Sequence, residues 1–151
     1  IPRGEPQDID VLHYGQPSDF RFAVFNALCR QGMGCVHACG LYGASRDSLI
    51  ARSKLVLNLN LFSQSRIFEI VRVSYLLSNS KAVVADLHPE TYVEPDLRDS
   101  VAFAAPEKIT DCCQMLLEDE PARRRLEKQG EETMRKRDIR IILTRALEAS
   151  G

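Results

Sequence analysis

The fold is decided by residues 54–86, KLVLNLNLFSQSRIFEIVRVSYLLSNSKAVVAD. The apolar runs at its two ends, residues 54–61 and 81–86, have the length and the side chains of buried strands. Between them, residues 66–78 carry apolar side chains at helical spacing. These cover more than half of the helix circumference, which predicts a helix buried on most sides; they are Ile67, Ile70, Val71, Val73, Leu76 and Leu77.

The rest of the chain continues this alternation of strands and helices. Ser18 is placed to cap the first helix, Gly32 and Gly34 follow it, and residues 87–98 are polar and contain two prolines, which predicts a loop. Further strands are predicted over residues 9–14, 35–41 and 101–105, and further helices over residues 45–53, 107–117, 122–136 and 139–149. The alternation predicts an α/β fold, a Rossmann-like doubly wound parallel sheet of about five strands with a helical C-terminus. We expect the first and third strands side by side, or separated only by the fourth.

Length and composition limit the class of protein. The chain has 151 residues, and we assign residues 1–7 to a linker or cut end and residues 8–151 to one domain. With 20 basic and 21 acidic side chains, the net charge of -1 gives no attraction to nucleic acid or to an anionic membrane. No apolar run reaches the roughly 18 residues that a membrane helix needs. Five cysteines lie inside apolar stretches, an arrangement that fits a reducing cytoplasm better than a disulfide framework.

The predicted ligand site lies beyond the carboxyl ends of the strands, where open parallel sheets bind their ligands. Four loops reach this edge: residues 14–18, 40–45, 60–66 and 86–98. Glycines in the first two let the backbone approach a phosphate, and helix N-termini behind two of the loops favour an anion. The sequence contains neither G-x-G-x-x-G nor G-x-x-x-x-G-K-[ST], which disfavours a dinucleotide oxidoreductase and a P-loop NTPase.

Metal and triad chemistry are disfavoured. Cys35, His37 and Cys39 alternate along one predicted strand, where neighbours on one face are about 7 Å apart, too far to share one ion. We therefore interpret them as structural residues and predict no metal site. His13 has no serine or cysteine with an acid partner nearby in the pattern, so a Ser-His-Asp triad is disfavoured.

Two charge runs mark the C-terminal helices. Residues 118–120, three acids before Pro121, predict a helix boundary. The basic run of residues 123–125 is interpreted as a solvated helix face.

Several stretches resemble the C-terminal half of group 1-like GT-B glycosyltransferases. Residues 49–60 (LIARSKLVLNLN) are similar to the short helix and strand before the sugar-donor loop, and residues 62–69 to the loop itself. Residues 75–86 (YLLSNSKAVVAD) resemble the end of the following helix, a small-residue turn and a Val-Val strand. Residues 109–130 (ITDCCQMLLEDEPARRRLEKQG) are similar to the paired helices that end such domains.

The resemblance implies a domain that binds a nucleoside-diphosphate sugar, with no cofactor or metal, and that is inactive without an N-terminal acceptor-binding domain. It implies these sugar-donor-binding residues: Gly15, Gln16, Gly43, Ser65, Arg66, Glu69 and Tyr75. We expect the helix entrance at Ser65 and Arg66 to be the mouth of the main cleft. The catalytic residues stay unassigned.

The sequence departs from the family at the two glutamates of the sugar-donor helix, which would fall on Ile67 and Tyr75. Glu69 is the only carboxylate there, and it can equally serve local helix electrostatics with Arg72 or Arg66. A non-catalytic interaction or scaffolding module that has lost sugar-donor binding is therefore the alternative. A flavodoxin-like or receiver domain is a third, disfavoured because no acidic cluster follows the first strand.

Overall fold

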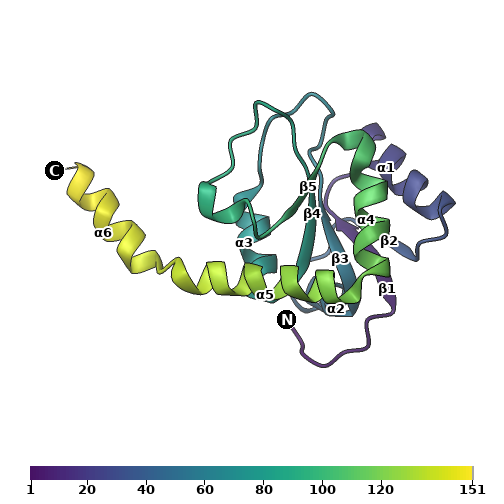
Figure 1. Ribbon diagram of the computed structural model, residues 1–151, viewed down its shortest axis with the longest axis horizontal. Coiled ribbons are helices and arrows are strands. Elements are labelled where there is room, and N and C mark those ends of the chain that lie inside the picture. Colours follow the sequence, from purple (N-terminus) through teal and green to yellow (C-terminus); the bar gives the residue numbers. More distant parts are fainter. Residues whose placement is uncertain (151) are drawn as a thin grey trace.

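A five-stranded, all-parallel sheet forms the centre of the computed structural model, which describes residues 1–150 (Figure 1). The strands lie in the order β2-β1-β3-β4-β5. Their bounds are Ile9–Tyr14 (β1), Cys35–Ala38 (β2), Ser53–Asn58 (β3), Ala82–Asp86 (β4) and Ala102–Ala104 (β5). Val11 of β1 is in register with Leu55 of β3, so the first and third strands are neighbours as predicted. The predicted fold class is confirmed.

Helices cover both faces of the sheet. They are α1 (Asp19–Arg30), α2 (Gly43–Arg52), α3 (Ile70–Ser78), α4 (Ile109–Glu118), α5 (Glu120–Lys136) and α6 (Ile139–Ser150), with 3-10 turns η1 (Pro95–Leu97) and η2 (Pro106–Lys108). Side chains of α2 and α3 pack on one face, and side chains of α1 and α4 pack on the other. Helix α5 packs against α3, α4 and β4, and α6 extends away from the body (Figure 1).

The core follows from the alternation of side chains along each strand. Leu12 and Val56 pack towards α2 and α3, whereas their neighbours Val11 and Leu55 pack towards α1 and α4. The strand order reverses at β1, so the carboxyl ends of β1 and β3 flank the switch point of the sheet. Flavodoxin-like sheets share this order.

The helix α3 begins later than predicted. It starts at Ile70, so residues 66–69 belong to the preceding loop. It is buried against the sheet and against α5, but its apolar side chains do not all face these neighbours, because Val71 is 84% exposed. Ile67, which was expected in the helix, is 65% exposed in the loop. The strands β2 and β3 likewise end before the predicted limits at residues 41 and 61.

The boundary between α4 and α5 is confirmed, and Arg124 and Arg125 of the basic run behind it are exposed as predicted, whereas Arg123 is not. Asp119 caps α5, with its Oδ1 accepting from the Ala122 N–H at 2.8 Å. Arg123 is 4% exposed, and its Nη1 donates to the Leu116 carbonyl at 2.9 Å. No helix among residues 1–150 is both long and apolar enough to cross a membrane.

Candidate functional site

The site begins at Gly15, directly after β1. Its φ of 137° lies in a region that L side chains rarely adopt. A Cβ at this position would lie 3.2 Å from Nη2 of Arg72 and 3.4 Å from Nη1 of Arg21. Glycine therefore allows the main chain to pass directly beside two guanidinium groups.

Arg21 forms the floor of the site. Ser18 caps α1 by accepting from the Arg21 N–H at 3.2 Å, which fixes the start of the helix. The buried guanidinium donates to the carbonyls of Gln16 at 2.8 Å and Asn60 at 3.1 Å, and also to that of Leu59. Arg21 thus ties the loop after β1 to the loop after β3, and these bonds occupy most of its donors.

A second tie joins the ends of β3 and β4. The main-chain N–H and the side-chain Nδ2 of Asn60 donate to the two carboxylate oxygens of Asp86, both at 2.9 Å. The Asp86 side chain is fully buried. Both ties are internal, so they hold the loops in place and leave ligand contacts to other residues.

A pocket of about 600 Å³ opens above this floor. It is lined by Tyr14, Arg46, Phe68, Glu69, Ile70, Val71, Arg72 and Tyr75. The Arg72 guanidinium lies 5.0 Å from the centroid of the Tyr14 ring, and that of Arg46 lies 4.8 Å from the centroid of the Tyr75 ring. Cation–π contacts thus hold two arginines from different helices at one pocket.

Arg72 keeps a hydrogen-bond donor unused. Its Nη2 pairs with Glu69 Oε2 at 2.9 Å, whereas its Nη1 is buried without a partner. The other oxygen of Glu69 lies 3.4 Å from Nη2 of Arg21, so the carboxylate sits between two guanidiniums. A buried donor without a partner costs free energy, and an anion in the pocket would satisfy it.

Tyr75 has a carboxylate beside it that comes from another helix. Burial raises the pKa of the Tyr75 hydroxyl, and its hydrogen bond to Asp47 raises that pKa further. Asp47 lies on α2, where the Arg46 guanidinium donates to its Oδ1 at 2.9 Å and 3.1 Å. The carboxylate that the resemblance expected at position 75 is thus replaced by a tyrosine backed by Asp47.

A smaller pocket of about 380 Å³ lies next to the first, on the loop after β4. It is lined by Leu87, His88, Pro89, Thr91, Val93, Arg98, Phe103 and Ala105. The rings of Phe68, in the first pocket, and Phe103, in the second, are 5.6 Å apart. The two pockets therefore share an aromatic wall.

The structure brings only some of the predicted site residues to this pocket. Glu69 and Tyr75 line it, and Gly15 borders it through Arg72. Gln16 contributes its carbonyl to the floor, while its side chain lies near Cys39. Gly43 begins α2 with a φ of 55°, and a Cβ there would meet no atom within 4 Å.

The position expected for Ser65 and Arg66 is wrong. They were expected at the entrance of a helix, but they lie in the loop before α3. The exposed Arg66 donates to the Ser65 carbonyl at 3.0 Å and pairs with Glu90 at 3.6 Å. The loop carries it outside the pocket lining, and Arg72, one turn into α3, takes the place beside Gly15. The i, i+3 spacing from Glu69 to Arg72 was the sequence signal for the pairing of these two residues. No sequence pattern indicated that Tyr14, Arg46 or Phe68 would line the pocket.

The histidines of β1 and β2 form a pair of their own. His13 and His37 stack with their Nδ1 atoms 2.9 Å apart, so one ring donates to the other. Burial, with repulsion from Arg21, His37 and Arg72, lowers the pKa of His13 to about 3. Among residues 1–150, no group of three or more His, Cys, Asp or Glu side chains is placed to hold a metal ion.

The fold is similar to that of two solved structures. The C-terminal domain of a group 1 glycosyl transferase family protein (LpcC) from Francisella tularensis aligns over 87% of each chain, with a TM-score of 0.59 and 13% identity. The fold is that of a GT-B C-terminal domain. TarM aligns with a TM-score of 0.66 and 11% identity, over 96% of this chain and 36% of its own. No protein-family model and no curated protein matches the sequence. The GT-B-like fold puts the pocket of Tyr14, Arg46 and Arg72 at the carboxyl edge of its sheet.

Proposed function

We propose that this chain is the sugar-donor-binding domain of a glycosyltransferase and that it binds a nucleoside-diphosphate sugar at the carboxyl edge of its sheet. The observation that carries the proposal is Arg72, which lines the pocket beside Gly15 and whose buried Nη1 has no partner. A diphosphate oxygen is the acceptor that a guanidinium fork prefers. The absence of a side chain at Gly15 lets that oxygen approach the main chain.

The rest of the nucleotide fits the neighbouring groups by chemistry. The Tyr75 hydroxyl, backed by Asp47, suits the ribose hydroxyls, which donate to and accept from such a pair. The apolar pocket behind Phe68 and Phe103 suits a nucleobase, because flat rings pack well against aromatic side chains.

The domain supplies half of the proposed reaction. The bond between the sugar C1 and the diphosphate breaks, the pair of electrons leaves with the diphosphate, and Arg72 stabilises the developing charge without a metal. The acceptor hydroxyl forms the new bond to C1 and loses its proton to a base. A separate N-terminal domain provides that base and the acceptor site, so the chain alone is inactive. The five free thiols, two of them exposed, support a reducing cytoplasm as its location.

Titration of the protein with UDP, GDP and ADP, followed by NMR, tests the proposal. We expect binding at high micromolar to millimolar affinity, with shifts centred on Gly15, Arg72 and Tyr75, because part of the site is supplied by another domain. Arg72→Ala should weaken binding about tenfold or more, since a charge-assisted hydrogen bond is worth about 1.5–3 kcal/mol. Arg66→Ala is the matched control and should leave the affinity unchanged.

The alternative is an interaction module that has lost sugar-donor binding. It is favoured by Ile67 and Tyr75, which stand where the family has carboxylates. The absence of shifts at millimolar nucleotide, or shifts scattered away from the pocket, would contradict the proposed function and support this alternative. Robust release of nucleotide from nucleotide sugars by the chain alone would contradict its inactivity.

A further inference from the structure

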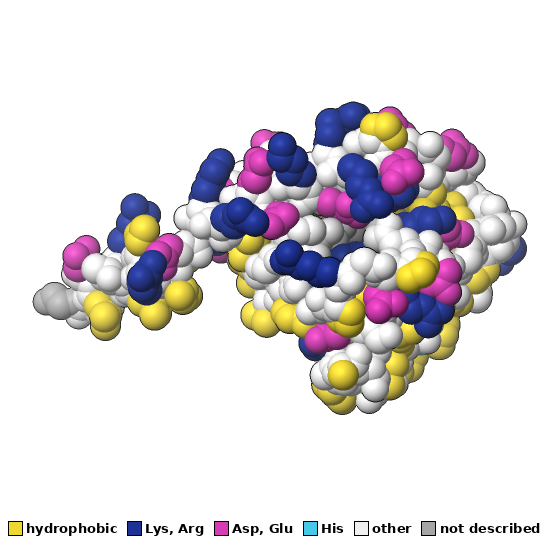
Figure 2. Space-filling model, turned by 90° about the horizontal axis from the view of Figure 1, so that it is seen from below, with side chains coloured by type: hydrophobic (Ala, Val, Ile, Leu, Met, Phe, Trp, Pro, Cys, Tyr) yellow, Lys and Arg dark blue, Asp and Glu magenta, His cyan; other side chains and the backbone are white. Residues whose placement is uncertain are grey.

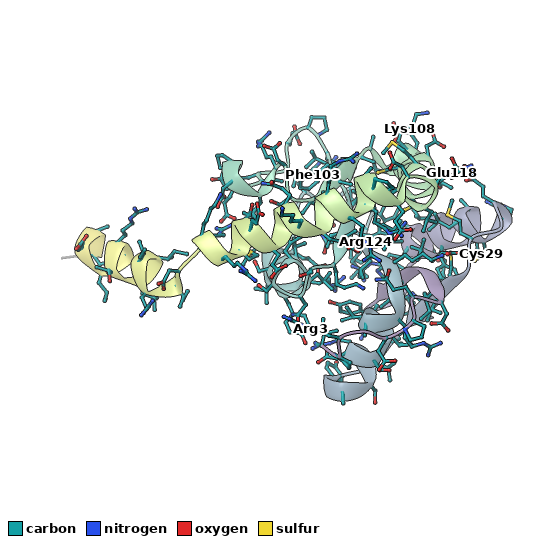
Figure 3. The ribbon with its side chains drawn as sticks, turned by 60° about the horizontal axis from the view of Figure 1, so that its bottom comes forward. Arg3, Cys29, Phe103, Lys108, Glu118 and Arg124 are labelled. Atoms are coloured by element: carbon teal, nitrogen blue, oxygen red, sulfur yellow. The ribbon has the colours of Figure 1, made fainter. Side chains whose placement is uncertain are left out.

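A second pocket of about 600 Å³ lies at the opposite, amino-terminal edge of the sheet. Figure 2 shows this side of the molecule, where basic and acidic side chains gather around a hollow. The lining comes from segments far apart in sequence: the first seven residues, the end of α2, the start of β3, the turn before β4 and the start of α5. Arg3 and Arg124 reach it from opposite ends of the chain (Figure 3).

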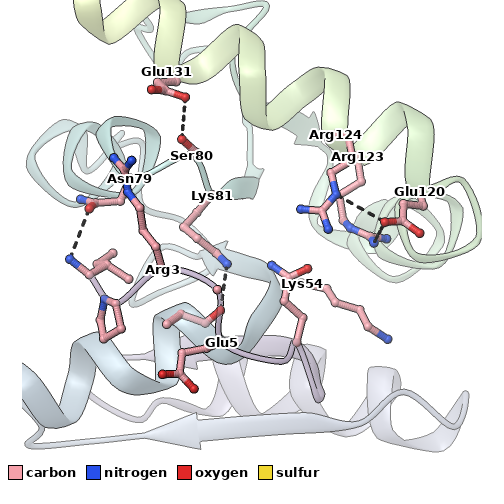
Figure 4. Close-up of a pocket in the computed structure, with 15 residues that line it drawn as sticks. Arg3, Glu5, Lys54, Asn79, Ser80, Lys81, Glu120, Arg123, Arg124 and Glu131 are labelled. Carbon is pink, nitrogen blue, oxygen red and sulfur yellow. Dashed lines mark hydrogen bonds and ion pairs between the residues drawn. The ribbon is translucent and has the colours of Figure 1, made fainter.

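Lys81 is a buried cation in this pocket. It is 5% exposed, and Figure 4 shows it among the residues that line the pocket. Its Nζ donates to the carbonyls of Ser53 at 2.6 Å and Ala51 at 3.4 Å, at the end of α2. These partners are neutral, so they satisfy hydrogen bonds without cancelling the charge. The pKa of Lys81 is lowered to about 8, mainly by burial and also by the nearby Arg124 and Arg123, against the opposing effect of Glu127.

Arg123 is a second buried cation in the same lining. Its Nη1 bonds to the Leu116 carbonyl, and its Nε is buried without a partner. The carboxylate paired with it, that of Glu120, is 3.9 Å from Nη2 and is largely exposed. Arg123 therefore brings a charge and an unused donor to the pocket.

The surrounding carboxylates do not balance these two charges. The buried Glu127 accepts at Oε2 from Nη1 of Arg124 at 2.9 Å, and its Oε1 is buried without a partner. Glu5 also lines the pocket, but it is exposed. Lys54 is paired with Asp10 at 2.6 Å. The carboxylate of Glu131 is held by Ser80 at 2.7 Å and by Arg135 at 2.6 Å. The buried cations of the lining are thus Lys81 and Arg123, and the one buried carboxylate near them, that of Glu127, is shared with Arg124.

We propose that this pocket binds a small phosphate-bearing anion between Lys81 and Arg123. A buried charge without a counter-ion is costly, and a phosphate oxygen would neutralise it and accept from the free Arg123 Nε. The tetrahedral anion is small enough for the space and leaves room for an ester group. This site lies across the sheet from the sugar-donor pocket, so it stands independently of the proposed function.

The first test is titration of the whole chain with inorganic phosphate at neutral pH, with sodium chloride matching the ionic strength. We expect saturable NMR shifts at the amides of Ser80, Lys81 and Arg123. Lys81→Met or Arg123→Met should weaken binding about tenfold, and Arg125→Met, on the exposed face of α5, should not change it. Absence of saturable shifts, or shifts centred on Gly15 and Arg72 instead, would overturn the proposal.

Two further measurements protect this test. If either buried variant fails to fold, the affinity of the wild type for sulfate is measured from pH 7 to 9. The charge of sulfate is constant over this range, so the affinity should fall about tenfold as Lys81 loses its proton. An affinity independent of pH, with both variants unfolded, would overturn the assignment to Lys81.

A comparison of glycerol phosphate with inorganic phosphate separates an ester ligand from the bare ion. Tighter binding of the ester supports an organic phosphate, and equal binding supports the ion. Binding of neither compound overturns the site.

Discussion

Arg21 is the single side chain on which the geometry of the candidate site depends most. Arg21→Met would leave the carbonyls of Gln16, Leu59 and Asn60 without their donor. We expect the free energy of unfolding to fall by about 2–4 kcal/mol, because each unsatisfied buried polar group costs about 1–3 kcal/mol and the loops relax in part. Urea denaturation measures this loss.

The control for this prediction lies on the same helix. Arg30→Met changes an exposed arginine in the last turn of α1 and should alter stability by no more than about 0.5 kcal/mol. Equal stability of the Arg21 and Arg30 variants would show that Arg21 does not hold the two loops together.

The sequence predicted which kind of side chain lies beside Glu69 better than which position supplies it. Of the two arginines that the spacing offered to Glu69, Arg72 pairs with it, whereas Arg66 pairs with Glu90. Which guanidinium lies beside Gly15 depends on where α3 begins, and that is set by tertiary packing. Arg46 could not be found from the sequence, since its contact with Tyr75 joins two helices that no local pattern connects.

The contact between α5 and α3 depends on Gly130. A Cβ added there would lie 2.7 Å from Cδ2 of Leu77, so the fully buried leucine side chain would have to shift against its neighbours. Gly130→Ala should therefore lower stability by about 1–3 kcal/mol, although alanine in place of glycine normally stabilises a helix by about 1 kcal/mol. Thermal or urea denaturation gives the sign.

The companion variant isolates the cause. Leu77→Val removes bulk at this contact, so the cost of Gly130→Ala should shrink in its background. A stabilising Gly130→Ala in the wild-type background would mean that the two helices can separate without penalty.

At the scale of elements, strands were predicted more accurately than helix starts. Residues 9–14 match β1, because a buried strand is an apolar run between polar ends. The sequence predicts a start of α3 at Arg66 because Ile67 continues its apolar period. Phe68 instead packs against Phe103 from a loop, and its apolar character serves a contact that lies outside the helix.

The pH dependence of stability belongs to the molecule as a whole, and His13 contributes a component that can be isolated. The folded-state pKa of His13 is about 3, against 6.5 for an ordinary histidine. Between these values the unfolded chain binds the extra proton, so stability falls as the pH is lowered below about 6.5, by about 1.4 kcal/mol per unit. His13→Leu should remove this component.

Urea unfolding at about pH 7 and pH 5 measures the effect. The wild type should lose about 2 kcal/mol more than His13→Leu over this interval. Identical losses in the two proteins would show that His13 is protonated in the folded state, in conflict with its burial and its contact with His37.

The overall architecture was within reach of the sequence, because alternating strands and helices admit few parallel arrangements, and β1 does lie beside β3. The pocket of Lys81 and Arg123 could not be predicted from the sequence. Arg123 stands in a basic run that is typical of a solvated face, and only the packing of α5 over the sheet edge buries it. The two buried cations meet there from elements separated by some forty residues, a distance that no sequence motif spans.

The hydrogen bond from Arg21 to Leu59 joins residues that are 38 positions apart in the sequence. This separation affects the order in which parts of the chain can fold during synthesis. A nascent chain that has emerged only as far as α2 contains β1, β2 and the arginine itself, but none of the carbonyls after β3 that the arginine binds. Loop closure over that distance carries an entropic cost that only the pairing of β1 with β3 repays. The pocket lined by Arg72 therefore cannot form before β3 has emerged, and its floor forms together with the centre of the sheet.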